Sequence, residues 1–120
     1  MKHLLPKLTQ RLQPFKEDAK AIDVPRFTLP VPQEDNETIS HSWLWPRVGQ
    51  FFKPGDVIVA ETGTSSFGIL DVPLPRDSVF VSQILWGSIG WTVGSTLGAA
   101  IAARDVGLKR TILFVGDGSM

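Results

Sequence analysis

The amino-acid sequence predicts an α/β fold, a partial parallel sheet with crossover helices. Three short apolar runs without a charged residue have the length and composition of buried strands: residues 57–60, 79–81 and 111–115. Helical segments are predicted before the first run and between the second and third. Apolar strands that alternate with helices are typical of a parallel sheet covered on both faces. Pro54 and Gly55, just before the first strand, suit the central positions of a type II turn.

The composition is that of an ordinary globular segment. The 120 residues are 42% hydrophobic and 20% charged, and twelve basic side chains balance twelve acidic ones. This balance argues against a nucleic-acid partner. The absence of cysteine excludes disulfides and thiolate metal sites. The first seven residues are too short and too polar for the core of a signal peptide, so we expect a cytoplasmic protein.

A charge-free stretch between Asp77 and Arg104 raises the alternative of a membrane helix. Residues 84–103 reach the length of a spanning helix, and they contain small residues at four-residue intervals: Gly90, Gly94, Gly98 and Ala102. The same twenty residues include four glycines and four hydroxyl residues, and charges of both signs flank them. We therefore predict no membrane segment and expect a buried helix over residues 89–104, ended near Gly107.

The first third of the chain differs from the rest in its pattern of apolar residues and in its proline content. Leucines at helical spacing predict a short amphipathic helix within residues 1–12: Leu4, Leu5, Leu8 and Leu12. Residues 13–39 are polar and contain four prolines, so we interpret them as an extended linker. The remainder, residues 40–120, is then the α/β domain. Its first helix is predicted to begin at Ser40 or Ser42, with an apolar face at Leu44, Val48, Phe51 and Phe52.

Two polar loops follow predicted strands, and ligands of parallel sheets bind beyond the carboxyl ends of the strands. Residues 61–68 offer hydroxyls and amides that suit a phosphate, although the alternative is a polar turn that caps a helix. At residues 116–119, Asp117 lies between two glycines, where a carboxylate suits Mg²⁺ and exposed amides suit phosphate oxygens. Each pattern alone is common in structural turns.

A third segment, residues 82–90, leads from the second strand into the glycine-rich helix. Gly87 and Gly90 leave backbone groups open to a ligand, and the alternative is structural packing with Trp86 buried. Taken one at a time the three segments are more typical of structural roles. Their occurrence together, in this order, favours a binding site.

These segments resemble one family. The runs AETGTSSFGI (60–69), SQILWGSIG (82–90) and ILFVGDGS (112–119) are similar to the pyruvate decarboxylase family of thiamine-diphosphate-dependent 2-oxo-acid decarboxylases, and the fungal enzymes are the nearest match. The resemblance implies that residues 1–12 end the family's middle domain, that 13–39 form its interdomain linker, and that 40–120 are the first part of a truncated diphosphate-binding domain.

The resemblance also implies two cofactors, thiamine diphosphate and Mg²⁺, and assigns their binding residues. Asp117 corresponds to a metal ligand. Gly87 corresponds to the residue whose carbonyl contacts the aminopyrimidine ring, and Ile89 to the side chain that keeps the cofactor bent. The cofactor-binding set implied in this way is Thr62, Thr64, Gly87, Ser88, Ile89, Gly118 and Ser119. No catalytic residue is implied within this chain.

The implied reaction of the intact enzyme is the non-oxidative decarboxylation of pyruvate to an aldehyde by a homo-oligomer, a dimer or a tetramer. Two alternatives stay open: an indolepyruvate or phenylpyruvate decarboxylase, or a non-catalytic remnant that binds partners or a nucleotide phosphate. Residues 63–68 lack the middle glycine of a dinucleotide-binding loop. The family's acid–base histidines, partner glutamate and asparagine pair have no counterpart here, since His3 and His41 match neither histidine. We expect no decarboxylation by this polypeptide alone, and an exposed apolar patch that includes Trp86, Trp91 and Phe114.

Overall fold

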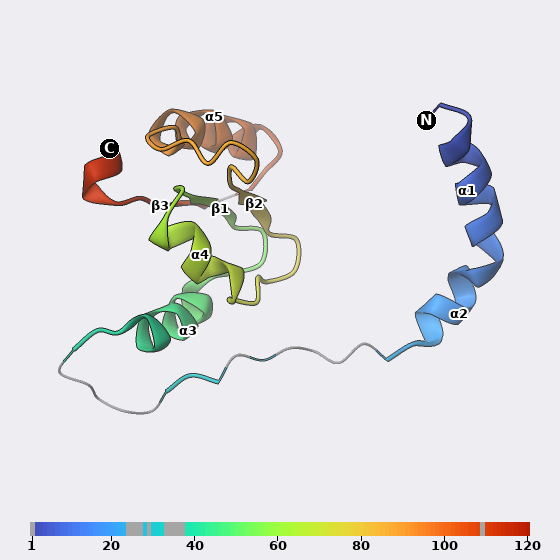
Figure 1. Ribbon diagram of the computed structural model, residues 1–120, viewed down its shortest axis with the longest axis horizontal. Helices are drawn as coiled ribbons and strands as arrows, with labels where there is room; N and C mark the ends of the chain where they lie inside the picture. Colours follow the sequence, from blue (N-terminus) through green and yellow to red (C-terminus); the bar gives the residue numbers. More distant parts are fainter. Residues whose placement is uncertain (1, 24–27, 29, 33–37, 109) are drawn as a thin grey trace.

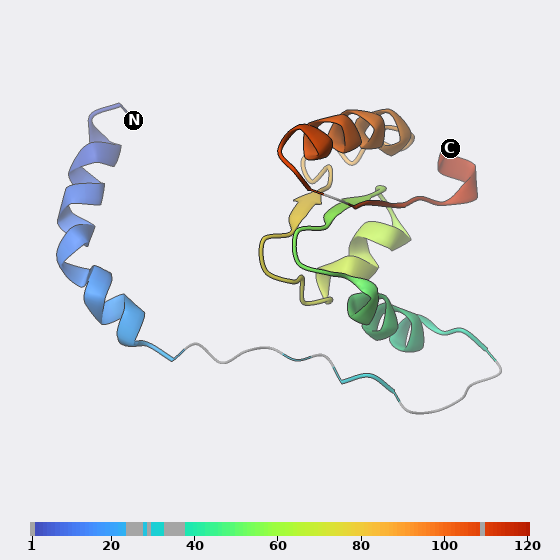
Figure 2. The same ribbon diagram turned by 180° about the vertical axis from the view of Figure 1, so that it is seen from behind.

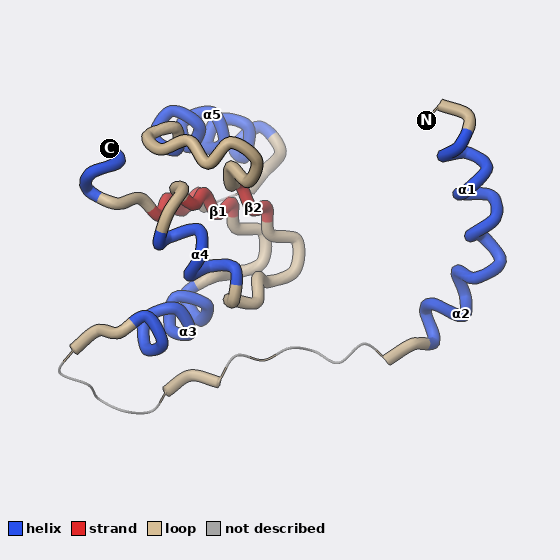
Figure 3. Tube along the Cα trace, in the orientation of Figure 1, coloured by secondary structure: helices blue, strands red, loops and turns tan. Residues whose placement is uncertain are grey.

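A computed structural model of the chain describes residues 2–23, 28, 30–32, 38–108 and 110–120. It contains a three-stranded parallel sheet in the order β2-β1-β3, which confirms the predicted α/β class (Figures 1 and 3). The strands are β1 (Val57–Ala60), β2 (Val79–Val81) and β3 (Thr111–Phe114), and all three predicted strands are present. Val57 pairs with Val79 on one side and with Thr111 on the other.

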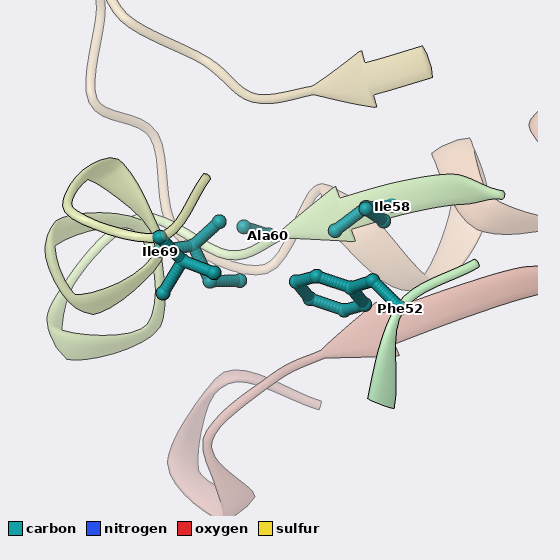
Figure 4. Packing of buried hydrophobic residues seen from close by; sticks show 5 residues of the cluster. Phe52, Ile58, Ala60 and Ile69 are labelled. Atoms are coloured by element: carbon teal, nitrogen blue, oxygen red, sulfur yellow. The ribbon is translucent and has the colours of Figure 1, made fainter. Parts of the chain in front are cut away.

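The core lies on both faces of the central strand. Ile58 and Ala60 pack against Phe52 and Ile69 on the face that α3 and α4 cover (Figure 4). Val57 and Val59 face α5 and pack against Ala103. Because helices cover both faces of β1, all four of its residues are buried, and this explains a strand sequence that is apolar without alternation.

Helix α3 (His41–Phe51) begins as predicted, because the Ser40 hydroxyl accepts a hydrogen bond from the Trp43 amide at 3.3 Å. Its predicted apolar face is wrong in part. Val48 packs on the core, but the Phe51 side chain is 57% exposed and lies under the guanidinium of Arg110. Phe52, the first residue after the helix, is buried as predicted.

Helix α4 (Thr64–Leu70) connects β1 to β2 and approaches α3 closely. A Cβ atom at Gly68 would lie 1.9 Å from the Trp45 ring, so no side chain fits there while the indole keeps its place. The indole is held in turn by a 3.0 Å hydrogen bond from its Nε1 to His41 Nδ1. Residues 61–63 form the turn before α4, and the Ser66 hydroxyl in the first turn of the helix accepts from the Gly63 amide at 3.3 Å. Locally, this segment has the turn-and-helix structure of the alternative interpretation.

Helix α5 (Thr92–Asp105) crosses from β2 to β3. It begins three residues later than the predicted Ile89 and ends at Asp105, one residue after the predicted Arg104, with Gly107 at φ +82° just beyond it. The Leu108 amide bonds to the Ala103 carbonyl at 2.8 Å and the Gly107 amide to the Arg104 carbonyl at 3.1 Å, the Schellman pattern of a helix end. Among the described residues, no helix has the length and apolarity to cross a membrane.

The N-terminal helices lie apart from the sheet in both views (Figures 1 and 2). The predicted amphipathic helix is α1 (Leu4–Leu12), and its four leucines are exposed. Helical structure continues through η1 (Gln13–Phe15) and α2 (Lys16–Ala21), so the predicted extended linker is wrong over residues 13–21. Pro14 lies in the first turn of η1, where a missing N–H costs nothing. The rest of the predicted linker falls partly outside the described residues.

An ion pair between the buried Asp56 and the partly exposed Arg110 lies at the amino edge of the sheet. The predicted type II turn is present, with Gly55 at φ +79° and a 3.1 Å bond from the Asp56 amide to the Lys53 carbonyl. The Asp56 carboxylate accepts from the Lys53 amide at 2.7 Å and from both Nε and Nη2 of Arg110. The hydrogen bond from Arg110 lowers the pKa of Asp56 and, with the Lys53 amide, outweighs the opposite effect of burial.

Candidate functional site

The three loop segments that the sequence singles out meet at the carboxyl edge of the sheet. The Glu61 amide, directly after β1, donates to the Phe114 carbonyl at 2.9 Å. The Glu61 side chain reaches the start of α5, and a Cβ atom placed on Gly90 would lie 3.6 Å from the Ser119 carbonyl oxygen. Glu61, Gly90 and Ser119 therefore share one site, although Gly90 follows Glu61 by 29 positions in the sequence and Ser119 follows it by 58.

Glu61 is the most buried polar group of this site, with 1% of its surface exposed. Its Oε1 accepts from the Thr62 amide at 2.9 Å. Its Oε2 accepts from the Gly90 amide at 3.3 Å, the Thr92 amide at 3.4 Å and the Thr92 hydroxyl. Burial raises the pKa of Glu61, but these hydrogen bonds together hold the pKa below its ordinary value, so the carboxylate is ionised at neutral pH.

Sequence reasoning did not single out Glu61 as a site residue. One signal was available: it is an acidic residue directly after a run of four apolar residues, at the end of a strand covered on both faces. A carboxylate in that position is buried and needs donors, and donors in a parallel sheet come from the neighbouring loops.

Thr62 and Gly87 both line a cavity of about 230 Å³ and lie side by side there. The Thr62 methyl group is 3.8 Å from the position of a Cβ atom on Gly87. The remaining walls come from α4, the end of β2 and the residues after it: Ser66, Phe67, Leu70, Phe80, Ser82, Gln83 and Ile84. The Thr62 hydroxyl oxygen is buried and has no hydrogen-bond partner in the structure. Buried hydroxyls normally have a partner, so a polar group of a ligand would complete this one.

The segment between β2 and α5 presents its apolar side chains outward. Ile84, Leu85, Trp86 and Ile89 are between 67% and 88% exposed, and the alternative of a buried Trp86 is wrong. Gly87 and Gly90 have φ values of +58° and +86°, which glycine adopts without strain. The Ser88 amide donates to the side-chain oxygen of Gln83, so the segment is fixed at its start by Gln83 and at its end by Glu61.

The predicted metal ligand, Asp117, lies in the loop after β3 and does not line the cavity. Asp117 begins η2 (Asp117–Ser119) and is exposed. The part of the chain that the structure describes contains no group of three acidic, histidine or cysteine side chains that could enclose a metal. Mg²⁺ usually binds through one or two carboxylates together with phosphate oxygens and water, so Asp117 fits a metal held jointly with a phosphorylated ligand.

The other predicted residues lie in the loops after β1 and β3 and do not line the cavity. Thr64 is the exposed first residue of α4 and does not line the cavity, whereas Gly63 before it has φ +124° and open space around it. Gly118 is also open, and the Ser119 amide bonds to the Gly116 carbonyl at 3.0 Å. These open glycines leave room for phosphate oxygens beside the backbone amides. The residues present thus fit a diphosphate with Mg²⁺.

The two histidines lie elsewhere, as the sequence suggests. His41 is exposed on α3 and accepts a hydrogen bond from Trp45, and His3 is exposed beside α1. Neither reaches the carboxyl edge, so this edge offers no histidine for proton transfer.

Comparisons with known proteins agree with the resemblance seen in the three segments. The chain is 44% identical to a pyruvate decarboxylase of Aspergillus terreus, 45% to that of Kluyveromyces marxianus and 44% to isozyme 1 of Saccharomyces cerevisiae. Each alignment covers 100% of this chain but only 21–22% of the relative. No protein-family model matches the chain. The sequence is therefore similar along its whole length to pyruvate decarboxylases, and it spans about a fifth of the length of those enzymes.

Proposed function

We propose that this chain forms the diphosphate-binding and Mg²⁺-binding portion of a thiamine-diphosphate-dependent 2-oxo-acid decarboxylase. The observation that supports this most directly is the buried hydroxyl of Thr62, without a hydrogen-bond partner among the described residues, in a cavity lined by two of the three family-like segments. A polar group of the cofactor would supply that partner.

Each predicted residue has a place in this proposal. Thr62 donates to or accepts from the cofactor, and the carbonyl of the neighbouring Gly87 accepts from its aminopyrimidine. Ile89, exposed on the same segment, supports the bent cofactor, with Ser88 beside it. Asp117 holds Mg²⁺, and Gly118, Ser119 and Thr64 contact the diphosphate. The bound cofactor would supply the electron sink for loss of CO₂, while the chain supplies shape, hydrogen bonds and the metal ligand.

In the whole protein, the proposed reaction is the non-oxidative decarboxylation of pyruvate to an aldehyde, in a cytoplasmic homo-oligomer. The names of the relatives support pyruvate as the substrate. No histidine lies at the carboxyl edge, so the proton transfers of the reaction need groups from outside the described part of this chain. We expect the 120-residue chain to bind the cofactor and to leave pyruvate unchanged.

Thr62→Val tests the proposal, because it replaces the unpaired hydroxyl by a methyl group of the same size. We expect the Kd for thiamine diphosphate, measured by calorimetry with Mg²⁺ present, to rise about tenfold. The free energy of unfolding should stay the same or rise by about 1 kcal/mol, since a buried hydroxyl without a partner is removed.

Thr9→Val is the matched control, since the Thr9 hydroxyl bonds only to the Leu5 carbonyl on exposed α1. It should leave the Kd unchanged. A Thr62→Val protein that binds as tightly as the original would contradict the proposed role of Thr62, and a wild-type chain that binds no thiamine diphosphate would contradict the proposed function itself.

A further inference from the structure

Glu61 lies where two walls of the site join, and it is held by donors alone. The amides of Thr62, Gly90 and Thr92 and the hydroxyl of Thr92 all donate to its carboxylate. In the described part of the chain, Glu61 forms no salt bridge. A buried carboxylate with four donors and no cation is stable only while each donor stays in place, so the carboxylate and the backbone around it fix each other.

The Thr92 donors belong to the first residue of α5, and Gly90 lies two residues before it. The first amides of a helix lack partners within the helix and carry the positive end of its dipole, so they attract anions. For Thr92 the anion comes from the chain itself, 31 residues earlier in the sequence. The Gly90 and Thr92 amides are therefore not open to an external phosphate, although Gly90 lies next to Ser119 and the proposed diphosphate site.

The two carboxylate oxygens act on two different segments that line the cavity. Oε1 accepts from the amide of Thr62, whose hydroxyl has no partner among the described residues. Oε2 accepts from the amide of Gly90, at the end of the segment that contains Gly87. The contact between Thr62 and Gly87 thus depends on one side chain that does not line the cavity.

We infer that Glu61 is a positioning residue of the cofactor site: its carboxylate holds Thr62 and the end of the 83–90 segment at a fixed spacing and occupies the Gly90 and Thr92 amides, which leaves the neighbouring residues 116–119 to a diphosphate. This inference rests on the proposed function for the identity of the ligand. The hold of Glu61 on the segment is independent of any ligand and can be measured without one.

Glutamine cannot replace Glu61, although the two side chains have the same shape. All four partners are donors, and an amide has only one acceptor oxygen. Whichever way it is turned, its NH₂ group faces an N–H or O–H donor. Glu61→Gln should therefore release one of the two walls while it leaves the apolar core around β1 unchanged.

Amide hydrogen exchange followed by NMR on the full chain tests the hold on the segment. In Glu61→Gln we expect exchange at Gly90 and Thr92 to accelerate about tenfold relative to Ile58 and Val59 in the core of β1. Glu17→Gln, on exposed α2, should change none of these rates. If Gly90 and Thr92 exchange at the original rate in folded Glu61→Gln, the inference is overturned.

A second pair of variants decides the matter if Glu61→Gln does not fold. Thr92 is fully buried, and Thr92→Ser keeps the hydroxyl that donates to Glu61, whereas Thr92→Val removes it. We expect exchange at Gly90 to be about fivefold faster in Thr92→Val than in Thr92→Ser. Equal rates in the two variants would overturn the inference.

Ligand titration tests the second half of the inference. Inorganic pyrophosphate with Mg²⁺ should shift the amide resonances of residues 116–119 more than those of Gly90 and Thr92, whereas larger shifts at Gly90 and Thr92 would overturn the inference. The Kd for thiamine diphosphate should rise about tenfold in Glu61→Gln. If wild type binds no thiamine diphosphate, the proposed function fails, and the exchange rates alone still test whether Glu61 holds the segment.

Discussion

The central strand β1 has a buried carboxylate on each side, Asp56 before it and Glu61 after it, and the two are stabilised in different ways. Asp56 is paired with the guanidinium of Arg110, which also donates to the Phe51 carbonyl at 3.0 Å. Glu61 has only amides and a hydroxyl as partners. Asp56 thus joins α3, β1 and β3 by an ion pair. Glu61 instead holds the backbone amides of the loop after β1 and of the segment before α5, beside the cavity.

The difference shows how one sheet separates stability from function. At the amino edge the partner of the carboxylate is a long cationic side chain that reaches across the sheet from before β3. At the carboxyl edge the partners are backbone groups of the segments that resemble the family motifs. A change at the first edge should alter the free energy of unfolding, and a change at the second should alter binding.

The largest expected effect on stability is that of Asp56→Ala. It leaves the Arg110 guanidinium and the Lys53 amide without their acceptor, and because Arg110 is 30% exposed we expect the free energy of unfolding to fall by about 2 kcal/mol, less than for a fully buried pair. The Kd for thiamine diphosphate of the folded protein should stay unchanged. Urea unfolding and calorimetry measure the two quantities, and an Asp56→Ala protein of original stability or with a weakened Kd would contradict the separation of the two edges.

Acid should act on both edges together. The pKa values of Asp56 and Glu61 lie below their ordinary values of 3.8 and 4.5, so both carboxylates stabilise the folded state at any pH above those ordinary values. This contribution is lost as the pH falls through the lowered pKa values of the folded state. We expect the urea midpoint to be constant between about pH 7 and 5 and to fall below about pH 4. In Asp56→Asn the fall should be shallower, and a midpoint that rises on acidification would contradict the assignment.

The smallest effect on stability is expected for Asp117→Asn. Asp117 is exposed and begins a short 3₁₀ turn, so the free energy of unfolding should change by less than about 0.5 kcal/mol. Binding of thiamine diphosphate should no longer respond to Mg²⁺, since the carboxylate that holds the metal is lost. Asp105→Asn, exposed at the end of α5, is the matched control. Equal Mg²⁺ dependence in the two variants would exclude Asp117 as the metal ligand.

The sequence predicts those parts of the fold that local chemistry determines. The strands are found because each is a short run without charge. Ser40 and the Pro54-Gly55 turn are found because capping and turn geometry depend on a few adjacent residues. The three site segments are also found, since a parallel sheet gathers its carboxyl-end loops at one edge.

The errors occur where contacts distant in the sequence decide. The start of α5 at Thr92 is fixed by a carboxylate 31 residues away, and no local pattern reports it. Phe51 has as its ring partner not the core but Arg110, 59 residues later in the sequence. The helices at residues 13–21 are an exception, because their causes are local: Pro14 lies in a first turn, where proline is compatible with a helix, and Lys20 pairs with Glu17 on α2.

The close approach of α3 and α4 has a consequence for how this sequence can vary among its relatives. Since the Trp45 ring fills the space that a Cβ atom on Gly68 would need, position 68 cannot accept any side chain while position 45 is tryptophan. A side chain becomes possible at position 68 only when a smaller ring or an aliphatic residue replaces the indole. Positions 45 and 68 should therefore change together in evolution, and a sequence that keeps the tryptophan should keep the glycine.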